Sequence, residues 1–473
     1  MKKYDLLKVL GISFLVIVAI SWVVPAGVYS NGSFVSMDAT APIGFYDIAR
    51  APLVTVATFV QYAILFLAIG GFYGVLNKTG AYGKLVDGIT DKWSKKSKKF
   101  LIITTLIFAL LSSICGLNTV TFILVPFFIS ILLKLGFKKI TAFAATVGAL
   151  LVGQIGSTLG LEVWGYLKVV FSQLGHDISM TSLILVRAIL LIITVTLFIL
   201  LIRKNDKDDV KDKKTKKEEV EIPLYEKKET KKGIIPLLVI GLFAIILLFV
   251  GLYNWYYTFD IDFFTNLHES ITEFEINGYP LFTNLLGTVS EIGNWGNYDI
   301  AVILIIASLI ISWVYSIKFK DTIDGFVSGM KQMLAPAIYA MLASVIFSVF
   351  INTSANFVFT MVNQFTKAGE FSLPGTIGSA LVSSFTYNDF SALASYFLPF
   401  YSTLDSNMIP VVALIFQSIF GLVMLIAPTS IFLLAGLSYL KIPYKEWAKY
   451  IWKFTLIILG VIVVISFIAT ALI

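Results

Sequence analysis

The stretch "IIPLLVIGLFAIILLFVGLY", residues 234–253, is almost entirely apolar and has no charged side chain. About 20 residues of α-helix cross the ~30 Å hydrocarbon core of a bilayer, because each residue advances the helix by about 1.5 Å. The strands of a transmembrane barrel would alternate apolar and polar residues, and this stretch does not alternate. It therefore predicts a membrane-spanning α-helix.

Composition extends this prediction to the whole chain. Of its 473 residues, 58% are hydrophobic and only 14% are charged, and the mean hydropathy is +0.87. Many other apolar runs have a similar length, so we expect an all-α, polytopic transmembrane bundle with about ten to twelve membrane segments. Several runs exceed one span and contain Gly, Pro or polar residues, which predicts broken helices or re-entrant hairpins. The run after "MKKYDLLK" is interpreted as a retained first helix, because so many spans follow it.

The sequence lacks the common signatures of catalysis and cofactor binding. Cys115 is the single cysteine, and His176 and His268 are too few and too far apart for a metal motif. There is no P-loop, nucleophile elbow or dinucleotide fingerprint, so we expect no cofactor and no enzymatic activity. The net charge of +7 comes from basic residues beside apolar runs. Orientation in the membrane explains those residues better than nucleic-acid binding does.

Lysine placement predicts how the chain is oriented in the plasma membrane. Residues 77–99 and 203–232 are rich in lysine, which is typical of the cytoplasmic side, and we place the N-terminus there too. Residues 254–297 contain several Asp and Glu but no Lys or Arg, so they are expected to face outward. Their aromatic residues would suit a short amphipathic helix in the membrane interface.

The charged segment 203–232 separates two halves of similar length, residues 1–202 and 233–473. We interpret the halves as N- and C-terminal transmembrane repeats, and the acidic segment 254–297 belongs to the second. The charged segment mixes both signs of charge with few apolar residues, which predicts a solvated cytoplasmic linker with little fixed structure. A regulatory docking site is the alternative.

Polar interruptions recur in the two halves. In the first half, "SSICGLNTVTFILVPF" (112–127) is followed by "LVGQIGSTLG" (151–160). In the second, "SSFTYNDFSALASYFLPF" (383–400) is followed by "LIAPTSIFLLAG" (425–436). Corresponding breaks in two halves are the best sequence-level indication of a transporter binding site built from discontinuous helices.

The residue types at these breaks suit such a site. An unwound membrane helix frees backbone amides that attract anions, and carbonyls that coordinate Na⁺ together with side-chain oxygens. The candidate oxygen donors are Asn118, Thr119, Ser157, Thr158, Ser383, Ser384, Thr386, Asn388, Thr429 and Ser430. A membrane Ser or Thr can instead bond its own backbone or a neighbouring helix, and Gly153, Gly156 and Gly160 can form a packing face.

Two charged residues near the breaks need separate interpretation. Asp389 can bind a cation, relay a proton or cap the following helix. Arg187 lies in the apolar run "LILVRAILLIITV", and we interpret it as extending to the outer interface rather than contacting an anionic substrate.

Four stretches carry a resemblance to a known family. "WVVPAGVYS" (22–30), "LFLAIGGFYGVLNKTGAYGKLVDGI" (65–89), "FVSGMKQML" (326–334) and "APTSIFLLAGLSYLKIPYKEWAKY" (427–450) resemble the YfcC-like branch of the anaerobic C4-dicarboxylate carrier family, within the ion transporter superfamily. The resemblance implies two inverted repeats, each with a re-entrant hairpin and an interrupted helix. It also implies a dimer that works by an elevator-like movement.

The resemblance also locates functional segments. It places the first hairpin tip at Gly116 to Thr119 and the second at Ser383 to Asp389, with helix breaks at Gly153 to Thr158 and Pro428 to Ser430. The chain departs from close relatives at the first tip, where a pair of glutamates is replaced by Leu117, Asn118 and Thr119. The second tip has "FTYND" in place of a glycine-rich sequence.

The expected function is secondary active transport of a small polar metabolite across the cell membrane. By resemblance the cargo is a C4-dicarboxylate or other organic anion, or an amino acid, and the transport is coupled to Na⁺ or H⁺ or proceeds by exchange. A channel is the alternative, although no repeated filter segment is visible. A membrane-embedded enzyme would need a base beside Ser383 or Ser384, and neither histidine lies in a polar break.

Overall fold

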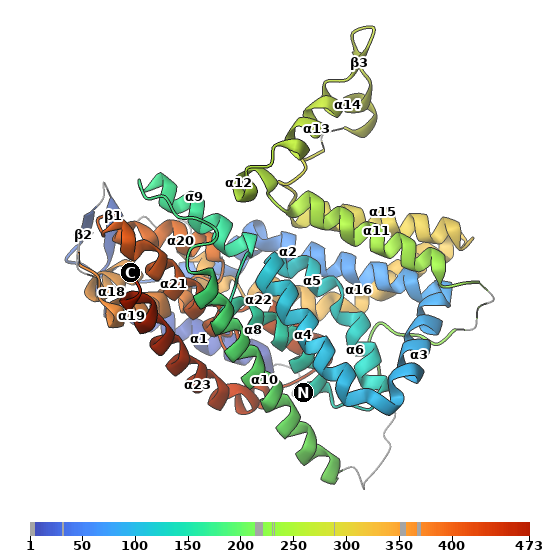
Figure 1. Ribbon diagram of the computed structural model, residues 1–473, viewed down its shortest axis with the longest axis horizontal. Helices are drawn as coiled ribbons and strands as arrows, with labels where there is room; N and C mark the ends of the chain where they lie inside the picture. Colours follow the sequence, from blue (N-terminus) through green and yellow to red (C-terminus); the bar gives the residue numbers. More distant parts are fainter. Residues whose placement is uncertain are drawn as a thin grey trace. The chain divides into compact units, whose positions relative to one another are not determined.

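The computed structural model describes residues 5–30, 33–212, 221–228, 230, 232–287, 289–350, 356–366 and 370–473. Apart from two short antiparallel hairpins, the regular structure of these residues is helical, which confirms the all-α prediction (Figure 1). The hairpins are formed by β1 (Gly27–Ser30) with β2 (Ser33–Ser36), and by β3 (Glu275–Ile276) with β4 (Tyr279–Pro280).

The chain forms two compact units. Unit 1 consists of Met1–Ala63, Val86–Pro223 and Gln332–Ile473, and unit 2 consists of Ile64–Leu85 and Leu224–Lys331. These units do not follow the two halves that we interpreted as repeats. The units are defined by how compactly residues pack, which does not test whether the two halves of the chain repeat the same structure. The repeat boundaries therefore stay a prediction.

Unit 1 contains most of the helices. Its α-helices are α1 (Asp5–Ser21), α4 (Ser97–Cys115), α5 (Asn118–Ile123), α6 (Val125–Lys134), α7 (Lys139–Phe143), α8 (Ala149–Ile155), α9 (Tyr166–Gln173), α10 (Ile184–Asp212), α17 (Val345–Ser348), α18 (Phe357–Phe365), α19 (Leu373–Thr386), α20 (Phe390–Phe397), α21 (Ile409–Met424), α22 (Ile431–Leu440) and α23 (Tyr444–Ala471). Its π-helical turns are η2 (Ala144–Gly148) and η3 (Leu161–Gly165), and its 3₁₀ turns are η1 (Ser94–Lys96), η4 (Leu398–Tyr401) and η5 (Ser406–Met408).

Unit 2 contains α11 (Ile235–Leu252), α12 (Trp255–Phe259), α13 (Phe263–Thr272), α14 (Leu281–Leu286) and α15 (Asn297–Val314). Helices α2 (Phe45–Thr79), α3 (Ala81–Trp93) and α16 (Phe319–Leu342) contribute residues to both units. Within unit 2, α11 and α15 pack against each other, and α12 to α14 with β3 and β4 form a projection connected to their ends (Figure 1).

Seven helical stretches of the described chain are long and apolar enough to cross a membrane. They are Phe45–Thr79, Ala81–Cys115, Ile184–Asp206, Ile235–Leu252, Asn297–Val314, Ser406–Met424 and Tyr444–Ala471. Shorter apolar stretches cover Asn118–Lys134, Lys139–Ile155 and Ile431–Leu440. These shorter stretches border the predicted turns and breaks. The chain is therefore a multi-pass membrane protein, and the count of ten to twelve segments stays a prediction.

Helices α8 and α21 form the core of unit 1. Every residue of α8 is buried, and so is every residue of α21 except Pro410. Helix α8 packs between α4 and α21, and α19 packs on α21. A helix that is apolar on all sides belongs in the interior of a large bundle. By contrast, α10 and α23 keep exposed apolar side chains, such as Leu185 at 76% and Phe467 at 65%, as lipid-facing helices do.

Glycines allow a close helix crossing in unit 2. A Cβ added at Gly74 of α2 would lie 2.0 Å from the carbonyl oxygen of Gly325 in α16. A Cβ added at Gly329 would lie 1.9 Å from the carbonyl oxygen of Gly70. The glycine spacing is that of the small-residue motif by which membrane helices approach closely without a hydrophobic driving force.

The charged segment 203–232 has more structure than we expected. Residues 203–212 continue α10, because an established helix can extend into water when its residues are charged helix formers. Residues 213–220 lie outside the described residues. Beyond them, the Pro223 carbonyl accepts a hydrogen bond from the Tyr439 hydroxyl (3.1 Å), within unit 1. The cytoplasmic location of this segment stays a prediction, as does the outward location of the acidic segment.

Candidate functional site

The first predicted tip is a tight turn between α4 and α5. Gly116 adopts a left-handed conformation (φ 69°), in which glycine is strongly favoured, and its N–H donates to the Ser112 carbonyl (3.0 Å). Helix α5 then begins at Asn118. The Ser112 hydroxyl donates to Asn118 Oδ1 (2.7 Å), which ties the two sides of the turn together.

The first predicted break lies directly against this turn. Helix α8 ends at Ile155, and the next helical turn, η3, begins at Leu161. The Ser113 hydroxyl donates to the Gly156 carbonyl (2.7 Å), and the Thr158 N–H donates to the Ser113 carbonyl (2.9 Å). A Cβ at Gly160 would lie 2.4 Å from Ser157 Oγ, so only glycine fits here without displacing that hydroxyl. The turn and the break thus form one interlocked structure.

Side chains from two other helices pair the carbonyls that the first break frees. Gln417 Nε2 on α21 donates to the carbonyls of Gln154 (2.7 Å) and Ile155 (2.6 Å). Arg187 Nη1 on α10 donates to the Thr158 carbonyl (2.6 Å). Sequence reasoning missed Gln417, although a lone glutamine within the apolar run "VVALIFQSIFG" was a usable signal.

The position of Arg187 corrects our interpretation. We expected this side chain to extend to the outer interface, but it is fully buried, with 0% exposure. Its guanidinium carbon lies 3.6 Å from the centroid of the Trp164 ring, and Nη2 donates to the Met180 carbonyl. The physical reason is that the unwound segment supplies carbonyl acceptors that a regular helix would not offer.

The second predicted tip joins α19 to α20. Asn388 Nδ2 donates to the Thr429 carbonyl (2.8 Å) and to Ser344 Oγ (3.1 Å). Asp389 caps α20, because its Oδ1 accepts the Ala392 N–H (3.0 Å). Of the three roles open to Asp389, helix capping is the one that the geometry displays.

The second predicted break lies between Met424, where α21 ends, and Ile431, where α22 begins. Its freed carbonyls are also paired by side chains. Trp447 Nε1 donates to the Leu425 carbonyl (3.0 Å), and the Tyr444 hydroxyl donates to the Ile426 carbonyl. Both donors belong to the stretch "PYKEWAKY", so this stretch stabilises the break.

Several buried polar atoms at the breaks have no hydrogen-bond partner. Three of them belong to the second tip and break: Ser384 Oγ, Asn388 Oδ1 and Thr429 Oγ1. Gln154 Oε1, Gln417 Oε1 and Arg187 Nε are also unpartnered and surround the first break. An unpaired buried polar group costs about 1–3 kcal/mol, so a cluster of them at one place indicates where a ligand, an ion or water binds.

Other candidate residues have structural roles here. Ser383 Oγ donates to the Ser379 carbonyl (2.8 Å), and Thr386 Oγ1 donates to the Ser383 carbonyl (3.0 Å), so both bond their own helix. A Cβ at Gly153 would lie 2.2 Å from the Ala109 carbonyl oxygen, so Gly153 permits the close packing of α8 on α4.

The remaining candidates lie at the same two places. Thr119 is buried within α5, and Ser157 Oγ is 3.5 Å from the Ser113 carbonyl. Pro428 lies in the second break, and the Ser430 N–H donates to the Ala427 carbonyl (3.0 Å) there. The first tip therefore meets the first break and the second tip meets the second break. Gln417 links α21 of the second half to the first break.

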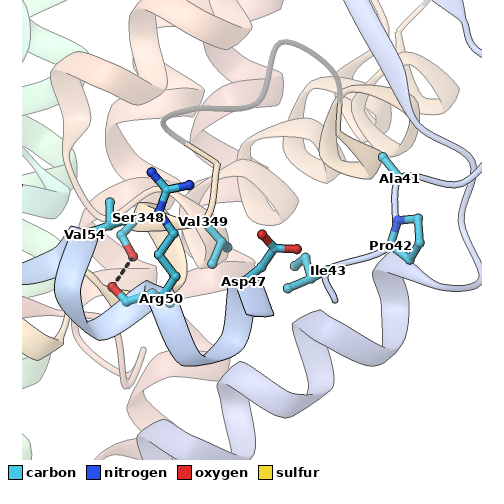
Figure 2. A pocket seen from close by; sticks show the side chains of 9 residues that line it. Ala41, Pro42, Ile43, Asp47, Arg50, Val54, Ser348 and Val349 are labelled. Atoms are coloured by element: carbon cyan, nitrogen blue, oxygen red, sulfur yellow. Dashed lines mark hydrogen bonds between the residues drawn. The ribbon is translucent and has the colours of Figure 1, made fainter. Parts of the chain in front are cut away.

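A separate pocket of about 260 Å³ lies near the start of α2 (Figure 2). It is lined by Ala41, Pro42, Ile43, Asp47, Arg50, Ala51, Val54, Ser348 and Val349. Asp47 and Arg50 extend from adjacent turns of α2, and Asp47 Oδ2 accepts the Gly44 N–H (2.9 Å). None of the candidate residues at the tips and breaks lines this pocket.

The described residues contain no group of three or more His, Cys, Asp or Glu that could hold a metal ion. His176 is buried and bonded through both ring nitrogens, to Ser406 Oγ (3.0 Å) and to the Ser402 carbonyl (2.8 Å). It therefore has a structural role in this state.

The chain is a multi-pass helical membrane protein with a turn locked against a helix break in each half, which is an arrangement typical of carrier-type transporters. More specifically, the chain belongs to the C4-dicarboxylate anaerobic carrier family, DcuC, whose family model matches residues 5–473. The YfcC-like branch stays a prediction.

Two further comparisons do not extend this assignment. No curated protein matches the chain. Among solved structures, the YdaH transporter of Alcanivorax borkumensis is 13% identical, with 98% of this chain and 96% of that chain covered and a TM-score of 0.37. At that score the structural comparison adds nothing to the assignment, which rests on the family match.

Proposed function

We propose that the protein is a secondary active transporter that carries a small organic anion, a C4-dicarboxylate or a related carboxylate, across the cell membrane. The observation that carries this proposal is the pair of interrupted helices, each held against a turn and bordered by unpartnered buried polar atoms. Membership of the C4-dicarboxylate carrier family supports the substrate class. An amino acid is the second substrate class to test.

The second break suits the coupling cation. Because Asn388 Nδ2 donates to two acceptors, its Oδ1 points away from them, and nothing donates to it. Ser384 Oγ and Thr429 Oγ1 are unpartnered in the same region. Neutral amide and hydroxyl oxygens are suitable ligands for Na⁺ at an unwound membrane helix. We therefore propose Na⁺ as the coupling ion, with H⁺ coupling or exchange as the alternatives.

The proposed carrier works as a homodimer and through an elevator-like movement, by analogy with its relatives. The pairing of the freed carbonyls favours a carrier over a channel. A selectivity filter needs carbonyls that face the permeating ion. Here the carbonyls of Ile155, Thr158, Leu425 and Thr429 accept hydrogen bonds from side chains instead.

The test is transport by purified protein in liposomes. Uptake of radiolabelled succinate and of a panel of carboxylates and amino acids is measured under an inward Na⁺ gradient, under a pH gradient, and with unlabelled substrate inside. We expect gradient-driven accumulation or exchange of a carboxylate. A complete absence of flux across the panel would contradict the transporter, and discrete conductance steps in a planar bilayer would favour the channel.

A further inference from the structure

Arg187 is a buried cation that pairs with backbone carbonyls among the described residues. It is 0% exposed, and no described carboxylate forms an ion pair with it. A charge buried in a membrane protein is costly, and such residues persist mainly where the charge is used. Neutral side chains of similar size could have donated to the same carbonyls at lower cost. The position therefore calls for an explanation based on charge.

The contacts of Arg187 fix its guanidinium beside the first break. Nη1 donates to the Thr158 carbonyl, Nη2 donates to the Met180 carbonyl, and the Trp164 ring covers one face. Nε has no partner. The guanidinium is thus rigidly held at Thr158, which is the residue after Ser157. Its positive charge acts on the surroundings of the break through a medium of low dielectric constant.

The second break has a different electrostatic character. The side chains that pair its carbonyls are Asn388, Tyr444 and Trp447, all of which donate from neutral groups. Its unpartnered atoms are oxygens, whereas the first break also has the unpartnered Nε of a cation. The two breaks resemble each other in sequence but differ in charge.

We propose that Arg187 makes the first break a subsite for a carboxylate of the substrate and closes it to the coupling cation. Arg187 is a positioning and charge-selecting residue: it holds the Thr158 carbonyl in place and biases the Ser157–Thr158 segment toward an anion. This proposal rests on the proposed function. It adds that the first break binds the substrate anion and the second break binds the coupling cation.

The experiment compares succinate with its half-amide, succinamate, which has one carboxylate fewer and nearly the same shape. Purified full-length protein is measured for uptake KM in liposomes and for thermal stabilisation by each compound. The variants are Arg187→Lys, which keeps the charge, and Arg187→Gln, which removes it. Arg203→Gln is the matched control, because Arg203 is exposed on the same helix, α10.

In the wild type we expect succinate to be preferred over succinamate by about tenfold or more, as one desolvated charge interaction would provide. Arg187→Gln should remove this preference by raising the KM for succinate, with little change for succinamate. Arg187→Lys should restore most of it, and Arg203→Gln should leave it unchanged. A folded Arg187→Gln protein with the wild-type preference would overturn the proposal.

A second measurement does not depend on how well Arg187→Gln folds. The Na⁺ concentration that gives half-maximal succinate uptake is compared for Thr158→Val and Thr429→Val. We expect Thr429→Val to raise this half-maximal Na⁺ concentration. Thr158→Val should raise the KM for succinate and leave the half-maximal Na⁺ concentration unchanged. The reverse pattern would overturn the proposal.

The outcomes separate the two proposals. If transport occurs but succinate selectivity is independent of Arg187, the transporter stands and this inference fails. If no compound is transported but succinate stabilises the wild type and not Arg187→Gln, the inference stands and the transporter fails. If succinate is neither bound nor transported, this inference fails.

Discussion

Asn388 uses one end of its side-chain amide and leaves the other end without a partner. Nδ2 holds the Thr429 carbonyl and Ser344 Oγ, and Oδ1 is buried without a donor. The Thr429 carbonyl fixes which end of the amide is the donor, because a flipped amide would place its oxygen against that carbonyl oxygen. One residue therefore serves both the fold and the proposed ion site.

Asn388→Ala should lower both stability and transport. Loss of the donor leaves the buried Thr429 carbonyl unpaired, which costs about 1–3 kcal/mol. The free energy of unfolding in detergent and succinate uptake are measured together. Asn407→Ala is the control, because Asn407 is exposed and its backbone N–H, not its side chain, donates to Asp405 Oδ1. Unchanged stability and uptake for Asn388→Ala would contradict both roles.

Asp389 allows capping to be separated from charge. Its Oδ1 accepts the Ala392 N–H and the Ser391 hydroxyl, and Asn caps a helix about as well as Asp does. Asp389→Asn should therefore keep the unfolding free energy within about 0.5 kcal/mol, whereas Asp389→Ala should lower it by about 1 kcal/mol. If the charge is used, Asp389→Asn also changes the cation or pH dependence of uptake. Normal transport by this variant would show that Asp389 acts only as a helix cap and that its charge is not used in transport.

At the scale of elements, the breaks depend on other helices. An unwound segment leaves carbonyls that need donors, and in a membrane protein water does not reach them unless a cavity is present. The first break obtains its donors from α4, α10 and α21, and the second from the tip after α19 and from α23. Each break is thus a junction of several helices, and its stability depends on all of them.

Gln417→Leu tests the junction between α21 and α8. Leucine keeps the volume but removes the donor to the Gln154 and Ile155 carbonyls, so we expect a loss of about 2 kcal/mol or more. Thermal unfolding measures it, with Gln173→Leu, at an exposed position of α9, as the control. An unfolding temperature equal to that of the control would show that these bonds do not hold the break.

Gly153→Ala distinguishes between two roles of Gly153, one in helix packing and the other in ligand binding. The new methyl group would meet the Ala109 carbonyl oxygen, so α4 and α8 must separate, at a cost of about 1–3 kcal/mol. Gly11→Ala in α1 has no atom within 4 Å of the new methyl group and should be neutral or slightly stabilising. A Gly153→Ala protein with wild-type stability but a raised KM would place Gly153 in the substrate site instead.

At the scale of the whole molecule, the chain passes between its two units at residues 63/64, 85/86, 223/224 and 331/332. The tips and breaks all belong to unit 1. Unit 2 has the glycine crossing of α2 and α16 and contains none of the candidate residues. The proposed transport function is therefore concentrated in one of the units.

Accessibility of the second tip should depend on ligand. Phe385 is 42% exposed, and reaction of a cysteine introduced there, on a Cys115→Ser background, with a membrane-impermeant thiol reagent reports whether water reaches the tip. If the tip lines an alternating site, we expect labelling from a given side to change by several-fold on addition of Na⁺ and succinate. A cysteine at the exposed Asn407 should not respond. Ligand-independent labelling of both positions from one side would identify the tip as an ordinary surface loop.

The sequence by itself determined the fold class and the positions of the interruptions. Long apolar runs permit few structures in a bilayer, because every backbone polar group must be paired within the protein. Gly, Pro, Ser and Thr interrupt helices through local conformational preferences, so the turn at Gly116 and the break at 428–430 could be predicted. The first break was predicted at Gly153 to Thr158, but α8 continues through Ile155, so the break begins only at Gly156. These properties depend on neighbours along the chain.

Only the tertiary structure decided which side chains meet at the breaks. Gln417 bonds a carbonyl 263 residues away, and Asn388 bonds one 41 residues away. Arg187 is a charged residue within an apolar run, so the sequence favoured a position at the membrane surface for its side chain. Packing instead placed it against Trp164 and a freed carbonyl. The physical reason is that a donor is matched to a freed carbonyl by position in space, which helix packing sets and local sequence does not.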